Sequence, residues 1–219
     1  MSRVATTSRD LFPEPTLQRL PWYLAYVSRL RAASVEYVSS TQISKELNVD
    51  ASQIAKDLSF LNIRGKTRIG YEVAGLERVL QDFLGFKRAH NAVIIGVGSL
   101  GAALIQDSGL SRFGLNIVAG FDIDPGVVGV DKGGIPVYHM DDFALRLPEL
   151  QAEIGIVTVP ADRAQHVADE AVEAGIKALW NFPPCRIRTA PGIVMQDTSI
   201  YAHLALMYNR MDQQKRAQL

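Results

Sequence analysis

The sequence predicts an α/β protein in which a winged-helix domain precedes a doubly wound parallel sheet of the Rossmann type. Two observations predict this fold. From residue 91 onward, apolar segments rich in β-branched residues alternate with helical segments, which is typical of parallel strands joined by helices on both faces of a sheet. Before them, two short capped helices and a turn with basic residues occupy residues 39–73, which is the layout of a helix-turn-helix with a wing.

The composition indicates a soluble globular protein. The 219 residues suffice for one large domain or two modest ones, and 47% of them are hydrophobic. No run of 18 apolar residues occurs and the N-terminus lacks the apolar core of a signal peptide, so we expect a cytoplasmic protein without a membrane span. The single cysteine, Cys185, excludes an intrachain disulfide and a thiolate metal cluster, and we expect no metal.

The charge balance neither requires nor excludes nucleic acid as a partner. Formal net charge is zero, with 11 basic and 9 acidic residues in residues 1–85 and 12 and 14 in the remainder. An asymmetry this small does not diagnose nucleic-acid binding, so the placement of the basic side chains must decide.

The chain begins with an expected arm, residues 1–14, followed by a helix over residues 16–33. Pro21 interrupts the helical pattern, and we expect it to begin the main helix in its first turn, where a missing N–H is harmless. Residues 36–40 read as a brief extended piece. The apolar positions of the helix recur at steps of three and four; they are Leu17, Leu20, Leu24, Val27 and Leu30.

Two short helices follow, each opened by a capping-box pattern. Ser39 and Gln42 form the first pattern, and Asp50 and Gln53 form the second. The helices are predicted at residues 41–47 and 51–61. Because only Asn48 and Val49 lie between the first helix and the cap residue of the second, the pair predicts a helix-turn-helix whose second helix can enter the major groove of DNA.

The second of these helices turns polar side chains outward from an apolar face. Small and amide-bearing side chains can reach base edges, and a lysine can meet a phosphate or a guanine. Any amphipathic surface helix has such a polar face, so this helix alone does not establish DNA binding. The candidate DNA-contacting residues are Ser52, Gln53, Lys56 and Ser59.

Residues 63–73 predict a β-hairpin around Gly65 with Arg64, Lys66 and Arg68 at its tip. A basic hairpin directly after a recognition helix is a wing that lies along phosphates or in the minor groove. A solvated turn is the alternative, because charges concentrate at turns. Both features together favour double-stranded DNA as a partner. An amphipathic helix over residues 76–84 then closes the first domain, which we place at residues 1–85.

The strongest motif lies in residues 91–101. A buried strand runs into glycines spaced G-x-G-x-x-G and then into a helix, as in a dinucleotide-binding turn. Phosphate would sit on the free N–H groups at the helix start. A phosphate-free tight turn is the alternative. The candidate cofactor-binding residues here are Gly96, Val97, Gly98, Ser99, Leu100 and Gly101.

A second strand, residues 115–121, ends in Asp122, 21 residues after the last of these glycines. A carboxylate at this place binds the ribose hydroxyls of a dinucleotide. Asp124 lies just beyond, and no basic residue follows before Lys132. Because this negative charge repels a ribose 2′-phosphate, we expect the cofactor to be NAD(H) and not NADP(H).

The rest of the second domain, which we place at residues 86–197, continues the alternation. Strands are expected at residues 135–138, 154–159, 178–182 and 193–195, and helices at 141–147 and 161–174. Ligands bind beyond the carboxyl ends of such strands. Each of these strand ends could equally be an ordinary turn without a ligand. The candidate residues for the nicotinamide side of the cofactor are Thr158, Val159, Pro160, Asn181, Phe182 and Pro183.

The last segment, within residues 198–219, is apolar nearly all round over residues 200–211. Such a helix needs burial on several sides. A second subunit is the natural source of that burial, so we expect a homodimer with this helix at the interface.

The motifs that carry a family resemblance lie in both halves of the chain. They are Arg19-Leu20-Pro21, Val38-Ser39-Ser40, Lys56-Asp57-Leu58-Ser59, Gly65-Lys66, Gly70-Tyr71, the loop of residues 96–101, residues 121–125, 133–138 and 158–161, Gly175-Ile176-Lys177 and Asn181-Phe182. Through these residues the chain resembles, over nearly its whole length, the Rex family of redox-sensing transcriptional repressors. The resemblance implies a homodimer with an N-terminal winged helix, an NAD(H)-binding Rossmann domain and a C-terminal helix swapped between subunits. It implies that NADH releases the protein from operator DNA while NAD⁺ permits binding.

The chain also departs from the family pattern. Ala55 replaces a common basic residue, Asn62 a usual glycine, and Asp107 an aromatic residue that contacts the cofactor region in some members. In the wing, Thr67 and Arg68 occupy positions at which the family typically has Arg and Gly. In the last helix, residues 201–204 differ from the family's usual Glu-Leu-Gln pattern. These departures concern the operator sequence and the details of the nicotinamide switch. Arg19 and Asp197 resemble a family charge pair whose partner changes with cofactor state; the alternative for each is a solvated surface charge.

Two rival functions are an NAD-dependent dehydrogenase and a DNA-binding sensor of coenzyme A. The dehydrogenase lacks a substrate domain, no Tyr-x-x-x-Lys pair exists, and the four histidines are scattered, so we expect no catalytic residues. Asp122 disfavours the coenzyme A sensor, because a carboxylate suits a free ribose diol and not a ribose 3′-phosphate.

Overall fold

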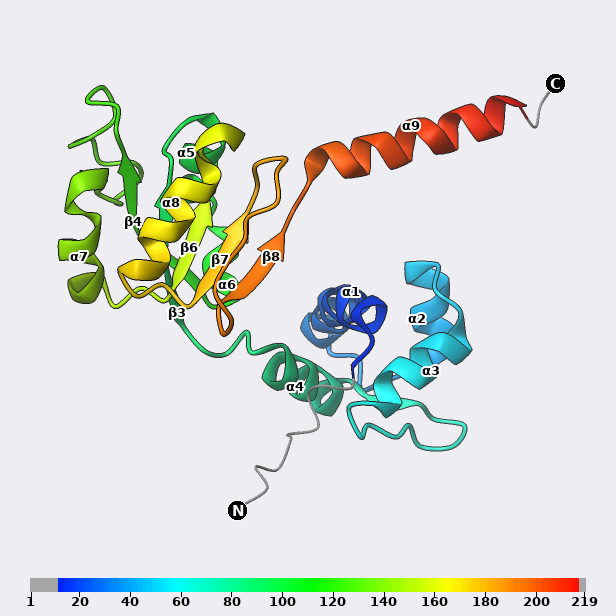
Figure 1. Ribbon diagram of the computed structural model, residues 1–219. Helices are drawn as coiled ribbons and strands as arrows, with labels where there is room; N and C mark the ends of the chain where they lie inside the picture. Colours follow the sequence, from blue (N-terminus) through cyan, green and yellow to red (C-terminus); the bar gives the residue numbers. More distant parts are fainter. Residues whose placement is uncertain (1–11, 217–219) are drawn as a thin grey trace, which may run out of the picture. The chain divides into compact units, whose positions relative to one another are not determined.

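The structure is a computed structural model that describes residues 12–216, and the chain divides into two compact units, residues 1–87 and 88–219 (Figure 1). Most of the expected N-terminal arm lies outside the described residues. Within the described part of the chain, no helix combines the length and the apolarity that crossing a membrane requires.

The first helix, α1 (Glu14–Ala32), runs without interruption through Pro21. The expectation that Pro21 begins the main helix was therefore wrong. Leu20, Tyr23 and Leu24 lie on both sides of the proline in sequence and are all at most 5% exposed. Burial of this continuous apolar face outweighs the hydrogen bond that a proline removes from a helix interior.

The remaining elements of the first unit form the predicted helix-turn-helix on α1. Helix α2 (Ser40–Leu47) begins with the predicted capping box, in which the Ser39 side chain accepts from the Gln42 backbone N–H. In α3 (Ala51–Ser59) the Asp50 side chain accepts from the backbone N–H groups of the first turn. Strands β1 (Tyr37–Val38) and β2 (Tyr71–Glu72) pair antiparallel, and α4 (Val73–Leu84) packs on α1. One apolar core joins all of these elements.

The predicted hairpin of residues 63–73 is only partly formed. Its second arm, β2, pairs with β1 and not with the residues that precede the tip. A single antiparallel bridge, between Lys66 and Gly70, closes the turn, and Arg68 lies in it with a φ of 65°. The arms are too short for a ladder of their own, so the wing is a tight loop anchored by β1.

The second unit contains a six-stranded sheet in which all neighbouring strands are parallel, in the order β5-β4-β3-β6-β7-β8. The order reverses between β3 and β6, and ligands of doubly wound sheets bind at such a switch point. The strands are β3 (His90–Ile95), β4 (Leu115–Asp122), β5 (Val137–His139), β6 (Ile154–Val157), β7 (Ala178–Asn181) and β8 (Val194–Asp197).

Side-chain alternation along β3 explains why helices cover both faces of the sheet. Val93 and Ile95 pack with α7 (Phe143–Leu150) and α8 (Ala161–Glu173), whereas Ile94 packs on the opposite face with α5 (Ser99–Gln106). Figure 1 shows α7 and α8 beside the strands. The predicted doubly wound fold is confirmed.

Local boundaries differ from the predictions in a few places. A short helix, α6 (Gly109–Arg112), and a 3-10 turn, η2 (Met140–Asp142), were not predicted. Strand β6 ends two residues and β7 one residue before its predicted end, whereas β5 and β8 extend one and two residues beyond theirs. The last helix, α9 (Ile200–Arg216), is exposed along its whole length, including Tyr201, Leu206 and Tyr208 at 55% or more.

Candidate functional sites

The loop from β3 to α5 has the geometry that its glycines permit. Gly96 has a φ of +97°, and a Cβ there would lie 2.7 Å from Val159 Cγ1. A Cβ at Gly101 would lie 2.1 Å from the carbonyl oxygen of Gly96, so only glycine allows α5 to approach the loop this closely. The loop is thus a tight turn with a helix start directly beside it.

The start of α5 is open to an anion. Its N-cap is Gly98, which supplies no side-chain cap, so the first-turn N–H groups of Ser99 and Leu100 have no capping side chain. A Cβ at Gly98 would meet no protein atom within 4 Å. Free N–H groups, the positive end of the helix dipole and open space together fit a pyrophosphate.

The carboxylate of Asp122 is held at the end of β4 by two backbone N–H groups. Oδ2 accepts from Val97 at 2.6 Å, and Oδ1 accepts from Asp124 at 2.9 Å. Asp122 therefore joins the glycine loop to the end of the neighbouring strand. Each oxygen keeps a further lone pair, so the carboxylate can still accept hydrogen bonds from a ribose diol. Asp124 is exposed and accepts from the Gly126 N–H.

The residues after β6 pack directly on the glycine loop. The Thr158 hydroxyl donates to the Gly96 carbonyl oxygen at 2.6 Å. The backbone N–H of Thr158 donates to the Ile95 carbonyl oxygen at 2.9 Å. Val159 lies against Gly96, and Pro160 immediately precedes α8. The structure therefore brings Thr158 and Val159 together with the predicted phosphate loop at one edge of the sheet.

The residues after β7 form the next part of the same edge. Asn181 is 1% exposed, and its Nδ2 donates to Asp197 Oδ1 and to the Cys185 carbonyl, both at 2.8 Å. The Phe182 ring lies 4.9 Å from the Trp180 ring, and Pro183 is buried. Trp180 also donates to the Thr198 hydroxyl at 2.8 Å. The end of β7 thus holds the segment that leads from β8 to α9.

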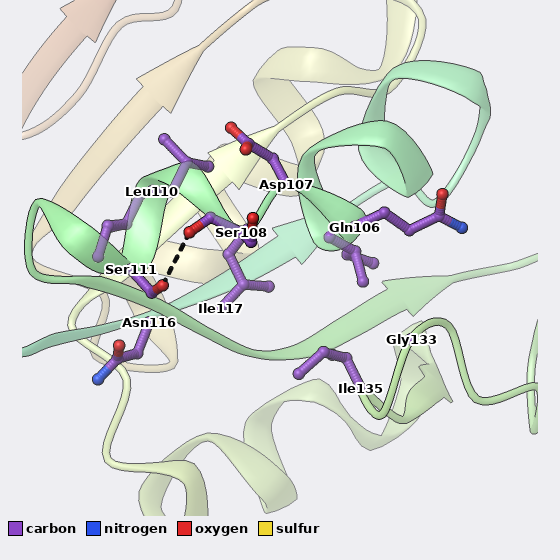
Figure 2. A pocket seen from close by; sticks show the side chains of 11 residues that line it. Gln106, Asp107, Ser108, Leu110, Ser111, Asn116, Ile117, Gly133 and Ile135 are labelled. Atoms are coloured by element: carbon purple, nitrogen blue, oxygen red, sulfur yellow. Dashed lines mark hydrogen bonds between the residues drawn. The ribbon is translucent and has the colours of Figure 1, made fainter.

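A cavity of about 410 Å³ lies at the other end of β4 (Figure 2). Leu115 and Ile117, which begin the strand, line it together with Asp107 and Ser108. Asp107 Oδ1 accepts from the Gly109 N–H at 2.7 Å and so starts the turn into α6. Because Asp122 ends the same strand, this cavity is separate from the predicted cofactor crevice.

Helix α3 presents a stripe of small side chains around one lysine, at the i, i+3, i+4 and i+7 positions that share one helix face. All four side chains are exposed, and the apolar side of the helix is buried. The stripe consists of Ser52, Ala55, Lys56 and Ser59. It includes three of the predicted DNA-contacting residues and adds Ala55. The fourth, Gln53, lies at the edge of this face, where its Nε2 donates to Asp57 Oδ1 at 2.8 Å.

Asp57 is the centre of a buried polar network that ties α3 to α1. It is 0% exposed. Its carboxylate accepts hydrogen bonds from Arg19 Nε at 2.7 Å, Arg19 Nη2 at 2.8 Å and Tyr23 Oη at 2.7 Å. Thr16 Oγ1 donates at 3.0 Å. Burial by itself would raise the pKa of Asp57, but the hydrogen bonds from Arg19, Tyr23, Gln53 and Thr16 prevail and lower it.

The sequence indicates Asp57 only as part of a family motif and does not reveal this network. The i, i+4 spacing of Gln53 and Asp57 was the available signal. The same network gives Arg19 a partner inside its own unit, and Asp197 has one in Asn181. The structure thus shows one partner for each member of the predicted switch pair.

The wing carries Arg64, Lys66 and Arg68 as exposed side chains, as predicted. Lys66 Nζ donates to the Tyr37 hydroxyl at 3.2 Å and lies 5.2 Å from the centroid of its ring. That hydrogen bond raises the pKa of Lys66, so the side chain stays charged. At the basic tip, β1 orders one side chain, whereas Arg64 and Arg68 have no hydrogen-bond or ion-pair partner within residues 12–216 and can extend towards phosphates.

Two family models match the chain. One, described as "Putative DNA-binding protein N-terminus", matches residues 12–59, and the other, described as "CoA binding domain", matches residues 87–185. The first covers α1 to α3, and the second covers the sheet through β7.

Relatives with established names match across both units. Redox-sensing transcriptional repressor Rex from Bacteroides thetaiotaomicron is 59% identical over 200 residues, which are 91% of this chain and 91% of the relative. The protein of the same name from Porphyromonas gingivalis is 56% identical over 199 residues, again 91% of each.

Two solved structures share the fold over nearly the full chain. A crystal structure of RSP in complex with β-NAD⁺ and operator DNA has a TM-score of 0.88 at 30% identity, covering 95% of this chain and 96% of that one. A crystal structure of RSP in complex with β-NADH has a TM-score of 0.84 at 30% identity, covering 95% and 98%.

Proposed function

The chain belongs to the Rex family of redox-sensing transcriptional repressors, and from that premise we propose that it binds operator DNA when NADH is scarce and leaves it when NADH is abundant. One observation carries the proposal: a single chain combines an exposed reading stripe on α3 with an open helix start beside Asp122. The first feature suits a DNA groove and the second a dinucleotide.

The predicted cofactor residues divide by the part of NAD(H) that each would hold. Residues 96–101 would bind the pyrophosphate through backbone N–H groups. Asp122 and Asp124 would accept from the ribose hydroxyls and disfavour a 2′-phosphate. The ring side would be formed by Thr158, Val159, Pro160, Asn181, Phe182 and Pro183. When bound, the cofactor supplies only a difference of one hydride and one positive ring charge, so discrimination falls to the groups around the ring.

The predicted DNA residues would act in two ways. Ser52, Lys56 and Ser59 face outward on α3 and would meet base edges in the major groove. Gln53 would contribute through its Oε1, because its Nε2 is bonded to Asp57. Arg64, Lys66 and Arg68 would neutralise phosphates, which fixes the register of the protein without reading sequence. Ala55, which stands in the middle of the stripe, would contact a thymine methyl group.

We propose a homodimer held by α9. Seven large apolar side chains of this helix are between 37% and 63% exposed in one chain, which a stable monomer rarely tolerates on one helix. A twofold dimer also pairs two recognition helices with two successive major grooves. The boundaries 1–85, 86–197 and 198–219 then correspond to DNA-binding, cofactor-binding and dimerisation regions.

The regulatory step is a change in the spacing of the two recognition helices. Moving the dimer from 1:99 to 99:1 between two arrangements requires about 5.5 kcal/mol of differential affinity. We propose that Arg19 takes part by exchanging Asp57 for Asp197, because Arg19 connects α1 to α3 and Asp197 lies just before α9. Such an exchange would couple the base of the dimerisation helix to the recognition helix.

We propose that the protein has no catalytic role and acts in the cytoplasm, where a repressor meets chromosomal DNA. Among the described residues, no group of three or more histidine, cysteine, aspartate or glutamate side chains could hold a metal ion. The match to a CoA binding domain favours one rival, a sensor of coenzyme A. Titration with coenzyme A distinguishes the two, since the carboxylate of Asp122 opposes a ribose 3′-phosphate.

The test is operator binding at controlled cofactor ratios. Operator DNA is selected from a random library with the NAD⁺-loaded protein, and its affinity is measured by fluorescence anisotropy as the NADH:NAD⁺ ratio rises. We expect the affinity to fall steadily with the ratio and to be unchanged by coenzyme A or NADPH at the same concentrations. An affinity indifferent to the ratio would eliminate the redox-sensor function.

A further inference from the structure

The tip of the wing is a tight turn in which Arg68 occupies a position that favours glycine. The Ile69 N–H donates to the Lys66 carbonyl oxygen at 3.1 Å, which makes Arg68 the third residue of the turn. Its φ is +65°. Turns with a positive φ at this residue usually carry glycine or asparagine there, because a longer side chain crowds the backbone. An arginine is thus present where the turn itself does not favour one.

The base of the loop is fixed, so the tip has a defined place. The Lys66 N–H donates to the Gly70 carbonyl oxygen at 2.8 Å, and the Gly70 N–H donates to the Lys66 carbonyl oxygen at 2.9 Å. A Cβ at Gly70 would lie 2.4 Å from the Val38 carbonyl oxygen, so the returning arm packs directly on β1. Residues 67–69 therefore form the end of a loop whose base is held by β1.

The three basic side chains of the wing differ in where they can reach. Lys66 Nζ donates to the Tyr37 hydroxyl, which holds this side chain beside β1. Arg64 comes before the Lys66 bridge and lies at the base of the loop. Arg68 lies at the tip, is exposed, and has no hydrogen-bond or ion-pair partner within residues 12–216. The tip therefore carries one basic side chain that no neighbour restrains.

The residue after Arg68 argues against a turn that meets only solvent. Ile69 is 51% exposed, whereas solvated turns are rich in glycine, proline, asparagine, aspartate and serine. Proteins that enter the minor groove of DNA combine arginine with apolar side chains that contact the base steps. Arg68 and Ile69 together have this composition.

The length of the loop allows the tip to reach the minor groove. Arg68 follows Ser59, the last residue of the reading stripe on α3, by nine residues. Nine residues span up to about 30 Å when extended. Neighbouring major and minor grooves are offset by about half a helical turn, or about 17 Å. With α3 in the major groove, the tip can thus enter the minor groove beside it.

The chemistry of a guanidinium selects the base pairs that it can meet there. At A·T pairs the minor groove presents only acceptors, adenine N3 and thymine O2, whereas G·C pairs add the N2 amine of guanine. Arginine carries donors only, so it pairs with the acceptors and not with the amine. A·T-rich segments also have a narrower minor groove with a more negative potential, which attracts an arginine.

Resting on the proposed binding of operator DNA, we infer that Arg68 is a specificity-determining residue that reads an A·T-rich minor groove next to the bases contacted by α3. This role goes beyond the neutralisation of phosphates proposed for the wing as a whole. It also explains why the turn carries an arginine at its left-handed position: the side chain contributes to binding what it does not contribute to the turn.

The test changes the minor groove and leaves the major groove as it is. In operator DNA selected with the wild-type protein, 2,6-diaminopurine replaces adenine at one flanking position at a time. This base adds an amine to the minor groove and keeps the N6 and N7 edge in the major groove. Fluorescence anisotropy should show that wild-type affinity falls about tenfold at the positions that Arg68 reads. An inosine·cytosine pair at these positions lacks the amine and should keep the affinity within about twofold.

Two variants complete the test. Arg68→Asn suits the left-handed conformation, so its urea midpoint should be at least that of the wild type. It should bind the unmodified and the diaminopurine DNA within about twofold of each other. Arg64→Ala is the matched control: it removes a basic side chain from the base of the same loop. It should weaken binding to both DNAs equally, lower the slope of log K against log salt by about 1, and keep the tenfold discrimination. If Arg68→Asn does not fold, judged by circular dichroism, Arg68→Gly takes its place.

The outcomes separate this inference from the proposed function. Wild-type affinity that is indifferent to diaminopurine at every flanking position overturns the role of Arg68, as does tenfold discrimination that persists in Arg68→Asn. Discrimination lost equally in Arg64→Ala would assign the effect to the charge of the wing and not to Arg68. If no operator is bound, the proposed function fails and the inference fails with it. Discrimination lost only in the Arg68 variants establishes the minor-groove contact.

Discussion

Asp57 is the residue of the first unit whose surroundings have the largest consequence for stability. Its carboxylate is fully buried and accepts from four side chains of α1 and α3, and Arg19 is itself only 19% exposed. An asparagine here would offer one oxygen in place of two to donors that cannot turn away. Removing the charge also leaves the buried part of Arg19 without a counter-ion.

We predict that Asp57→Asn lowers the free energy of unfolding of the first unit by about 3 kcal/mol. Urea denaturation followed by Trp22 fluorescence, in a Trp180→Phe background, measures this unit alone. Asp82→Asn is the control, because Asp82 is 57% exposed in its ion pair with Lys87 and should cost less than about 1 kcal/mol. Equal denaturation midpoints for Asp57→Asn and the wild type would refute the stabilising role of Asp57.

The lowered pKa of Asp57 gives a pH dependence of known sign. A carboxylate whose pKa is lower in the folded than in the unfolded state contributes stability above the unfolded pKa, about 3.9. That contribution is lost as pH falls through the folded value. We predict that the stability difference between wild type and Asp57→Asn is constant from pH 7 to 5 and shrinks below about pH 4. A difference that persists undiminished to pH 2 contradicts the hydrogen-bonded carboxylate.

For single residues, the sequence indicates which residue types a site needs better than it indicates which residues form hydrogen bonds with one another. Asp122 could be placed because a dinucleotide fold requires a carboxylate at that spacing. The partners of Asp57 in α1 and the partners of Asn181 could not be predicted, because their positions depend on tertiary packing. Gln53 is the exception, because it lies four residues from Asp57 on the same helix. Arg19 illustrates the limit: its charge was evident, but its bond to Asp57 spans 38 residues.

At the scale of elements, the junction of β3 with α5 gives a matched pair of glycine substitutions. Gly101→Ala should destabilise the second unit by about 1–3 kcal/mol and abolish NADH binding, because its Cβ would meet the Gly96 carbonyl oxygen. Gly98→Ala should leave stability within about 0.5 kcal/mol of wild type and weaken NADH binding, because its Cβ enters only the space meant for the pyrophosphate.

Thermal unfolding and calorimetry with NADH measure the two effects separately. The φ of Gly98 is −69°, which alanine adopts without strain, so Gly98→Ala isolates the ligand effect. Wild-type NADH affinity in Gly98→Ala would show that the pyrophosphate does not lie at the start of α5.

Periodicity and caps predicted most elements. They failed where tertiary contacts override local preference, as in α1, whose apolar face continues past Pro21. They also failed at the wing, because β2 pairs with a strand more than 30 residues earlier and not with its sequence neighbour. The α6 helix has four residues, too short for a periodic signal.

At the scale of the whole molecule, α9 determines whether two copies assemble. A chain truncated after Asp197 should be a monomer by light scattering, because it lacks the exposed apolar side chains of α9. Leu204→Glu keeps the full helix and should also shift the protein towards monomers, since a charge enters the proposed interface. A dimer that persists in both variants refutes the role of α9.

The central claim is that cofactor binding in one unit and DNA binding in the other are energetically coupled. Coupling is reciprocal: if NADH weakens operator binding by some factor, the operator must weaken NADH binding by the same factor. Calorimetric titration of NADH into the free protein and into the operator complex measures this factor directly. We predict that the operator weakens NADH affinity by the factor found in the anisotropy experiment, whereas the same NADH affinity with and without operator would contradict the account.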